Sequence, residues 1–191
     1  MAKSAVKKNT RTIRSMRITR SRRYVKQTNN YNCGPTAIYN LLLWGDSVNW
    51  KNNYRQLNQI CNPVPEFGTG YLSMNFTIRR AIEDTPVKLV NIKIQPKYQE
   101  VKDHLYNGGS VIINFHWRKD EKNGEHYVFI DECNENGGFV INDCPDNPAR
   151  VHYSDRKIKL LLSKYFFNDG KFKKYIYPDR IYPKVWFFKK L

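Results

Sequence analysis

The chain lacks several features that define common classes of protein. No apolar run approaches the roughly 18 residues of a membrane-spanning helix. The first residues contain no hydrophobic signal core, so we expect neither a membrane span nor export by a signal peptide. The glycine-rich phosphate loops G-x-x-x-x-G-K and G-x-G-x-x-G are also absent. Nucleotide binding through either loop is therefore not expected.

Cysteine is scarce, and no C-x-x-C pair occurs. Four cysteines at positions 33, 61, 133 and 144 suggest a reducing compartment rather than a disulfide framework. Cys133, Cys144 and His152 lack the close ligand spacing of a structural zinc site. We expect no metal and no cofactor, and a location inside a cell or packaged in a virion-like assembly.

Acidic residues are missing from the first 26 positions. Residues 1–26 hold ten Lys and Arg, residues 171–191 hold seven against Asp179, and residues 27–170 hold sixteen of each sign. The formal net charge of +16 thus belongs to the two ends. The sequence predicts a basic extended arm over 1–26, a neutral domain over 27–170 and a basic aromatic tail over 171–191.

The N-terminal arm carries arginines at nearly regular intervals of three. They are Arg11, Arg14, Arg17, Arg20, Arg22 and Arg23. Such a segment buries too little apolar surface to fold alone. Its lysines and arginines suit a polyanion, because each cation that neutralises a phosphate releases a counterion. We expect the arm to bind nucleic acid or a large assembly; a transit peptide and a solvated tail are the alternatives.

The C-terminal tail interleaves lysines with aromatic residues. A basic surface with stacking rings suits single-stranded nucleic acid. The equal alternative is a final strand or arm whose rings dock on a sheet while its lysines face solvent.

The central residues have the composition of a folded domain. The 191 residues are 40% hydrophobic and include 27 Phe, Tyr and Trp side chains, enough for one sizeable core. Spacing predicts helices over 33–44, within 49–61, and over 72–83, 98–106 and 154–166, and strands over 87–94, 110–117, 126–133 and 138–144, with a loop at 118–125. Asn136-Gly137 is a strong hairpin signal. The result is an α+β fold.

Cys33 lies at the start of the first predicted helix. Apolar residues at Ala37, Ile38, Leu41, Leu42 and Trp44 give that helix one buried face. Pro35 suits its first turn, and Gly45 is expected to end it as a C′ residue. Unpaired amides and the positive end of the dipole at a helix start favour a thiolate.

A cysteine nucleophile needs a base, a group that orients the base, and donors for an oxyanion. Gln27 is a neutral donor six residues before Cys33. His126 and Asp143 lie on the two strands of the predicted hairpin. If the hairpin loop has an even number of residues, the numbers of two directly opposed residues add up to an odd number. Asp143 is then opposite an even-numbered residue, so Asp143 and the even-numbered His126 share a face of the hairpin. Asp143 would then orient His126 toward Cys33.

This pattern of residues resembles the papain-like cysteine peptidases. The resemblance begins with the Q-x5-C-G pattern, and the C-G-P-T-A form is most similar to the branch that cleaves double-glycine leader peptides. The order Cys, His, Asp, with the ending I-N-D-C-P, also resembles that branch. The resemblance covers about residues 24–166. It implies a papain-like fold, with an N-terminal helical half packed on an antiparallel sheet, and a peptide or protein substrate.

Two functional hypotheses follow from these observations. The first is a cysteine peptidase with Cys33 as nucleophile, His126 as base, Asp143 as orienting group and Gln27 as oxyanion donor, anchored to a nucleoprotein or virion assembly by basic tails. The alternative is a catalytically silent protein that keeps the fold and serves as a structural or nucleic-acid-binding component of a large assembly.

Overall fold

The computed structural model describes residues 24–65, 68–119, 122–141, 150–163, 165–168, 171–174 and 182–191. The elements follow the chain in the order α1 (Cys33–Trp44), α2 (Tyr54–Cys61), α3 (Tyr71–Ile82), β1 (Val87–Ile94), α4 (Tyr98–Tyr106), β2 (Ser110–Lys119), β3 (Lys122–Asn134), β4 (Gly137–Ile141), β5 (Arg150–Ser154), α5 (Asp155–Leu161), β6 (Tyr165–Asn168), β7 (Lys171–Lys174) and β8 (Lys184–Lys190). This is the expected α+β arrangement.

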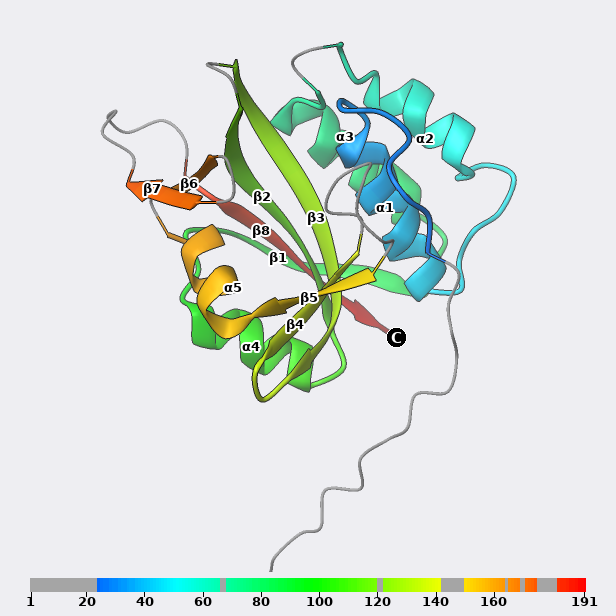
Figure 1. The fold of residues 1–191 in the computed structure, drawn as a ribbon. Coiled ribbons are helices and arrows are strands. Elements are labelled where there is room, and N and C mark those ends of the chain that lie inside the picture. Colours follow the sequence, from blue (N-terminus) through cyan, green and yellow to red (C-terminus); the bar gives the residue numbers. More distant parts are fainter. Residues whose placement is uncertain are drawn as a thin grey trace, which may run out of the picture.

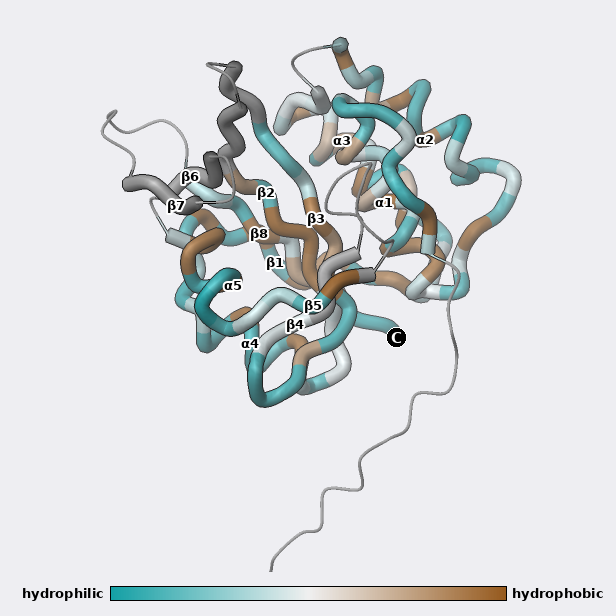
Figure 2. The backbone as a smooth tube through the Cα atoms, in the orientation of Figure 1, coloured by the Kyte–Doolittle hydropathy of each residue, from teal (hydrophilic) through white to brown (hydrophobic). Residues whose placement is uncertain are grey.

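One sheet runs through the molecule, and helices cover both of its faces. Its strand order is β1-β8-β2-β3-β4-β5, with neighbours along this path antiparallel; β6 also pairs with β2 and with β7. Helices α1 to α3 lie on one side and α4 and α5 on the other (Figure 1). The most hydrophobic stretches are the inner strands β2, β3 and β8 (Figure 2), so the core lies on both faces of the central sheet.

The two faces of the sheet contribute to separate apolar clusters. The first joins α1, α2 and α3 to residues that include Tyr127, Phe129 and Trp186. The second joins α4 and α5 to residues that include Val111 and Val128. Strand residues of alternating number supply the two clusters, as the pleat of a strand requires.

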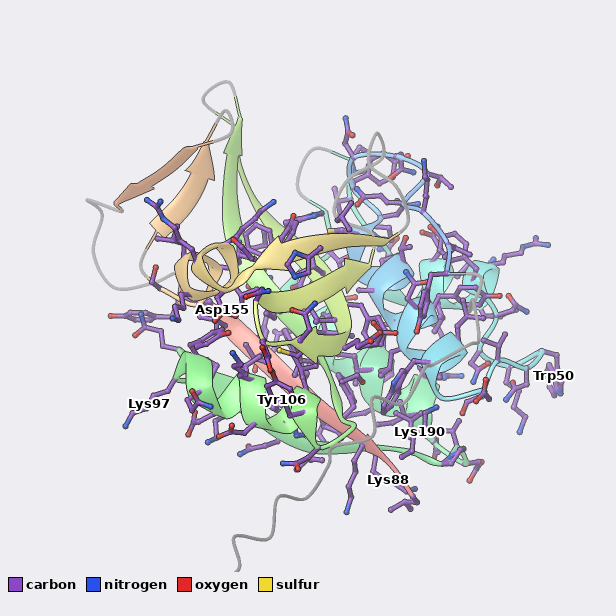
Figure 3. All side chains as sticks on the ribbon, turned by 60° about the horizontal axis from the view of Figure 1, so that its bottom comes forward. Trp50, Lys88, Lys97, Tyr106, Asp155 and Lys190 are labelled. Atoms are coloured by element: carbon purple, nitrogen blue, oxygen red, sulfur yellow. The ribbon has the colours of Figure 1, made fainter. Side chains whose placement is uncertain are left out.

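Polar contacts also join α4, α5 and the β3–β4 turn. Tyr98 on α4 donates a hydrogen bond through its hydroxyl to Asp155. Asp155 lies at the start of α5 (Figure 3). Lys102 Nζ lies 3.4 Å from Asp155 Oδ2 and 3.2 Å from the carbonyl oxygen of Glu135. These bonds join the second helical layer to the hairpin.

Several helix predictions were right in place but wrong in detail. Helix α3 buries Met74 and Ile78, whereas Leu72 and Phe76 are 80% and 59% exposed. Trp50 precedes α2 and is 76% exposed. Both faces of α3 carry apolar residues, so spacing alone did not identify the face that packs.

Helix ends also differ from the predictions. Gly45 has right-handed φ and ψ values (−75° and −6°), while Asp46 takes the positive φ of 52°. Glycine is needed at position 45 for a steric reason and not for its backbone conformation, because a Cβ there would lie 2.2 Å from Val87 Cγ2. Ser154 caps α5 by accepting a hydrogen bond from the Lys157 amide. However, α5 ends at Leu161, and the predicted helical residues at 165–166 belong to β6.

Two parts of the sheet were not predicted. The expected charged loop at 118–125 is strand where it is described, because β2 and β3 extend to Lys119 and from Lys122. Strand β8 lies between β1 and β2, so the sheet continues past the predicted domain boundary at residue 170. For residues 184–190, the final-strand alternative is the one observed.

Candidate active site

A tight turn delivers Cys33 to the first position of α1. The Asn29 side chain accepts hydrogen bonds from the backbone amides of Tyr31 and Asn32 at 3.1 and 3.0 Å. Asn32 occupies the N-cap position and Cys33 begins the helix, with Pro35 in the first turn, where an amide hydrogen is not needed. Cys33 therefore lies beside the amides of the first helical turn, whose dipole favours negative charge.

The preceding segment is fixed against the same helix. Asn40, fully buried in α1, accepts a hydrogen bond from the Val25 amide at 2.9 Å and donates one to the Val25 carbonyl at 3.1 Å. Gln27 is 4% exposed, and its Nε2 donates to the Asn29 carbonyl at 2.6 Å. Gln27 and Cys33 thus belong to one short segment, and the role of Gln27 as oxyanion donor stays a prediction.

Strand β3 meets the start of α1 at the residue before His126. Cys33 Sγ lies 4.0 Å from the carbonyl oxygen of Glu125. Glu125 and Tyr127 share one face of the strand, and His126 lies on the other, where its ring packs edge-on against Phe115 with 5.3 Å between centroids. The fold therefore brings Cys33 to the segment that carries His126, although 92 residues separate Cys33 from Glu125.

A polar cluster that the sequence did not predict surrounds the Glu125 side chain. Glu125 Oε2 accepts hydrogen bonds from Asn114 Nδ2 at 3.1 Å and Tyr127 Oη at 3.2 Å. Lys184 Nζ lies 3.9 Å from the other carboxylate oxygen. Burial is the main cause that raises the pKa of Tyr127 well above its usual value, and the nearby Glu125 charge raises it further. Nothing local in the sequence signals that Lys184 and Glu125 meet.

The loop between α2 and α3 packs against Gly34, the residue that follows Cys33. Cys33 is 2% exposed and Thr69 is 1% exposed. A Cβ on Gly34 would lie 2.5 Å from Thr69 Oγ1, and one on Gly68 would lie 3.9 Å from the Glu125 carbonyl oxygen. A peptide carbonyl can therefore reach Cys33 Sγ only if groups packed around it move.

Asp143 lies outside the described residues, so its predicted role as orienting group stays a prediction. The register argument for it does not hold, however. Paired residues sum to an odd number near the turn, as in Asn134 with Gly137, but to an even number beyond a β-bulge, as in Ile130 with Val140. The bulge falls at Asp131, whose carboxylate accepts a hydrogen bond from the Tyr24 hydroxyl.

The described histidine and cysteine residues elsewhere have structural contacts. The His104 ring lies 2.8 Å through Nε2 from the Phe188 carbonyl oxygen. Cys61 is 1% exposed, and burial raises its pKa to about 12, as expected of a small core residue. Burial also raises the pKa of Cys133. Among the residues that the structure describes, no group of three or more His, Cys, Asp or Glu side chains could hold a metal ion.

The predicted nucleic-acid-binding residues lie outside the described part of the chain. They are Arg11, Arg14, Arg17, Arg20, Arg22 and Arg23. Within the described ranges, no helix is both long and apolar enough to cross a membrane.

Comparisons with known proteins agree with the fold. The model of the Peptidase_C39 like family matches residues 20–166. No curated protein matches the sequence. The peptidase domain of Streptococcus ComA, described as a bifunctional ABC transporter involved in quorum sensing, is similar in structure, with a TM-score of 0.53, 12% identity, and coverage of 85% of this chain and 95% of that one.

A second solved structure is similar to the same extent. It is a double glycine motif protease from an AMS/PCAT transporter in complex with the leader peptide, with a TM-score of 0.52, 11% identity, and coverage of 86% of this chain and 89% of that one. The likeness to the two structures supports the expected papain-like fold.

Proposed function

The chain belongs to the Peptidase_C39 like family and is a cysteine peptidase, and on that premise we propose that Cys33, His126 and Asp143 are its catalytic triad. The observation that carries this proposal is the 4.0 Å approach of Cys33 Sγ to the carbonyl oxygen of Glu125, the residue directly before His126. It supports the pairing of a nucleophile at a helix start with a base on the adjoining strand.

In the proposed reaction, His126 removes the thiol proton and the Cys33 thiolate attacks the scissile carbonyl carbon. The tetrahedral oxyanion accepts hydrogen bonds from Gln27 Nε2 and the Cys33 amide; a donor of this kind contributes about 3–4 kcal/mol in the transition state. His126 then protonates the leaving amine, which leaves a thioester on Cys33. Water, deprotonated by His126, hydrolyses the thioester and restores the thiol. Asp143 orients the imidazole throughout.

The proposed substrate is a peptide or protein with small residues before the cleaved bond. A similar solved structure is a protease of the double glycine motif, bound to a leader peptide. Peptides with Gly-Gly before the cleavage site are therefore the first substrates to test. Little room exists around Cys33, and glycine needs the least.

We further propose that the basic arms anchor the enzyme to a polyanion such as nucleic acid within a nucleoprotein or virion assembly. The uneven charge supports this proposal, because residues 1–26 hold ten Lys and Arg and no acid. Binding of a single-stranded DNA oligonucleotide should weaken steeply with salt. Deletion of residues 1–23 should reduce this slope, and an unchanged slope would refute anchoring by the arm.

The triad is tested by labelling thiols in the purified protein with iodoacetamide at pH 6 to 8 and mapping the modified peptides. Cys33 should react first, and His126→Ala should slow its reaction at least tenfold. Cys61 should stay unmodified, because burial keeps its thiol protonated. If Cys33 reacts no faster than Cys133, the catalytic assignment fails, and the silent structural or nucleic-acid-binding alternative becomes the better description.

A further inference from the structure

The C-terminal strand reaches the active site from beyond the matched family region. The family match ends at residue 166, and β8 begins at Lys184. Within the sheet, Lys184 lies opposite Asn114 on β2, and Asn114 lies opposite Tyr127 on β3. A row of side chains therefore crosses three strands and ends on the strand that carries His126.

This row holds the Glu125 carboxylate from several sides. Lys184 Nζ lies 3.9 Å from Glu125 Oε1, while Asn114 Nδ2 and Tyr127 Oη donate to Oε2. The Lys184 and Glu125 side chains are only 15% and 28% exposed, so solvent screens this pair less than a surface pair. A carboxylate with this many partners restricts its own backbone, and the carbonyl of that backbone contacts Cys33 Sγ.

Lys184 also contacts the first residue of α3. Its Nζ lies 4.7 Å from the centre of the Tyr71 ring, and Tyr71 packs on Trp186 at 5.7 Å. Tyr71 directly follows the loop that carries Thr69 over Gly34. One lysine thus touches both the strand and the helix that border the nucleophile.

We infer that Lys184 is a positioning residue of the active site. By holding the Glu125 carboxylate, it fixes the β3 backbone where this strand meets Cys33, and so sets the approach of His126. Strand β8 is then a required part of the catalytic unit of this chain. The inference rests on the proposed roles of Cys33 and His126.

The test measures the rate of Cys33 alkylation by iodoacetamide from pH 6 to 9 in the full chain. Lys184→Met and Glu125→Gln should each slow the reaction about three- to tenfold and shift the midpoint of its pH profile. The double variant should be no slower than the worse single variant, since both substitutions break one linkage. Lys184→Arg should restore most of the rate, because it keeps the cation.

The direction of the two effects separates positioning from a simple charge effect. Removing a carboxylate near a thiolate favours the thiolate, whereas removing an ammonium disfavours it. A charge effect alone would move Glu125→Gln and Lys184→Met in opposite directions, and that result would overturn the inference. Lys93→Met is the matched control, because it breaks the Lys93–Glu100 ion pair on β1 and α4 and should leave the rate unchanged.

The outcomes distinguish this inference from the proposed function. If His126→Ala leaves Cys33 alkylation unchanged, the proposed catalytic pair is wrong and the inference falls with it. If His126→Ala slows the reaction but Lys184→Met and Glu125→Gln do not, only the role of Lys184 is refuted. Thermal unfolding of each variant verifies folding, and Glu125→Gln keeps the test decisive if Lys184→Met does not fold.

Discussion

Gly34→Ala should destabilise the protein, although alanine is the better helix former. In an ordinary helical position, this change would stabilise by about 0.5–1 kcal/mol. A Cβ on Gly34, however, would lie 2.5, 2.7 and 2.8 Å from Oγ1, Cβ and Cγ2 of Thr69. Rotation of the Thr69 side chain cannot relieve contact with its own Cβ, so the backbone of α1 or of the covering loop must shift.

The expected net loss follows from these opposing contributions. Overpacking of a filled site costs about 1–3 kcal/mol, which exceeds the gain in helix propensity. The net destabilisation should be about 1–2 kcal/mol, equivalent to a fall in Tm of about 2–8 °C for a chain of this size. Alkylation of Cys33 should slow as well, because the residue next to Cys33 is displaced.

Differential scanning calorimetry and Cys33 alkylation test this prediction. Gly70→Ser is the control, because a Cβ at Gly70 meets no atom within 4 Å and serine is favoured at an N-cap, the position that Gly70 occupies in α3. It should leave Tm within about 2 °C. A Gly34→Ala protein as stable as the wild type, or more stable, would show that the Thr69 loop does not pack on α1 as described.

Three further predictions concern other parts of the fold. The pKa of Cys61 is about 12 in the folded state and about 8.5 in the unfolded state. The protonated thiol therefore stabilises the folded state fully below about pH 8.5, and this stabilisation is lost as pH rises toward 12. Measured by denaturant unfolding, the Cys61→Ala variant should lose less stability than the wild type between pH 8 and 11. Asn40→Ala should cost about 1–3 kcal/mol and speed hydrogen exchange of the Val25 amide, since both hydrogen bonds between these residues are lost. Trp186→Ala should cost about 3–5 kcal/mol by chemical denaturation, whereas Lys189→Ala, at an exposed position of the same strand, should change stability by less than about 0.5 kcal/mol.

Local signals in the sequence predicted the parts of the site that local structure builds. The apolar spacing after Cys33 and the tolerance of Pro35 in a first turn were sufficient to predict α1 and the position of Cys33 at its start. Gln27 is buried on the same short segment as Cys33, and its role as oxyanion donor stays a prediction. The antiparallel β3–β4 hairpin was also predicted, since Asn136-Gly137 specifies a turn without reference to distant residues.

Parts of the site that depend on distant pairing were not predicted. Alternation along a strand reports its two faces but not a bulge, so the register between His126 and Asp143 could not be derived from parity. The place of β8 depends on pairing with β1, roughly a hundred residues earlier in the chain. Composition alone suggested nucleic-acid binding and a final strand equally for this segment, because a tail that contains both lysines and aromatic rings suits either.

The position of β8 in the sheet suggests that the proposed catalytic residues alone do not make an active site. Cys33 needs only a helix start, but His126 must arrive on a strand whose position is fixed by its neighbours in the sheet. Strand β2 lies between β3 and β8, and the buried Trp186 of β8 packs on Tyr127 beside His126. Loss of β8 would expose one edge of β2 and remove both Trp186 and Lys184 from this region. A chain that ends at residue 166, where the family match ends, should therefore keep the motif yet lose the proposed alignment of Cys33 with His126.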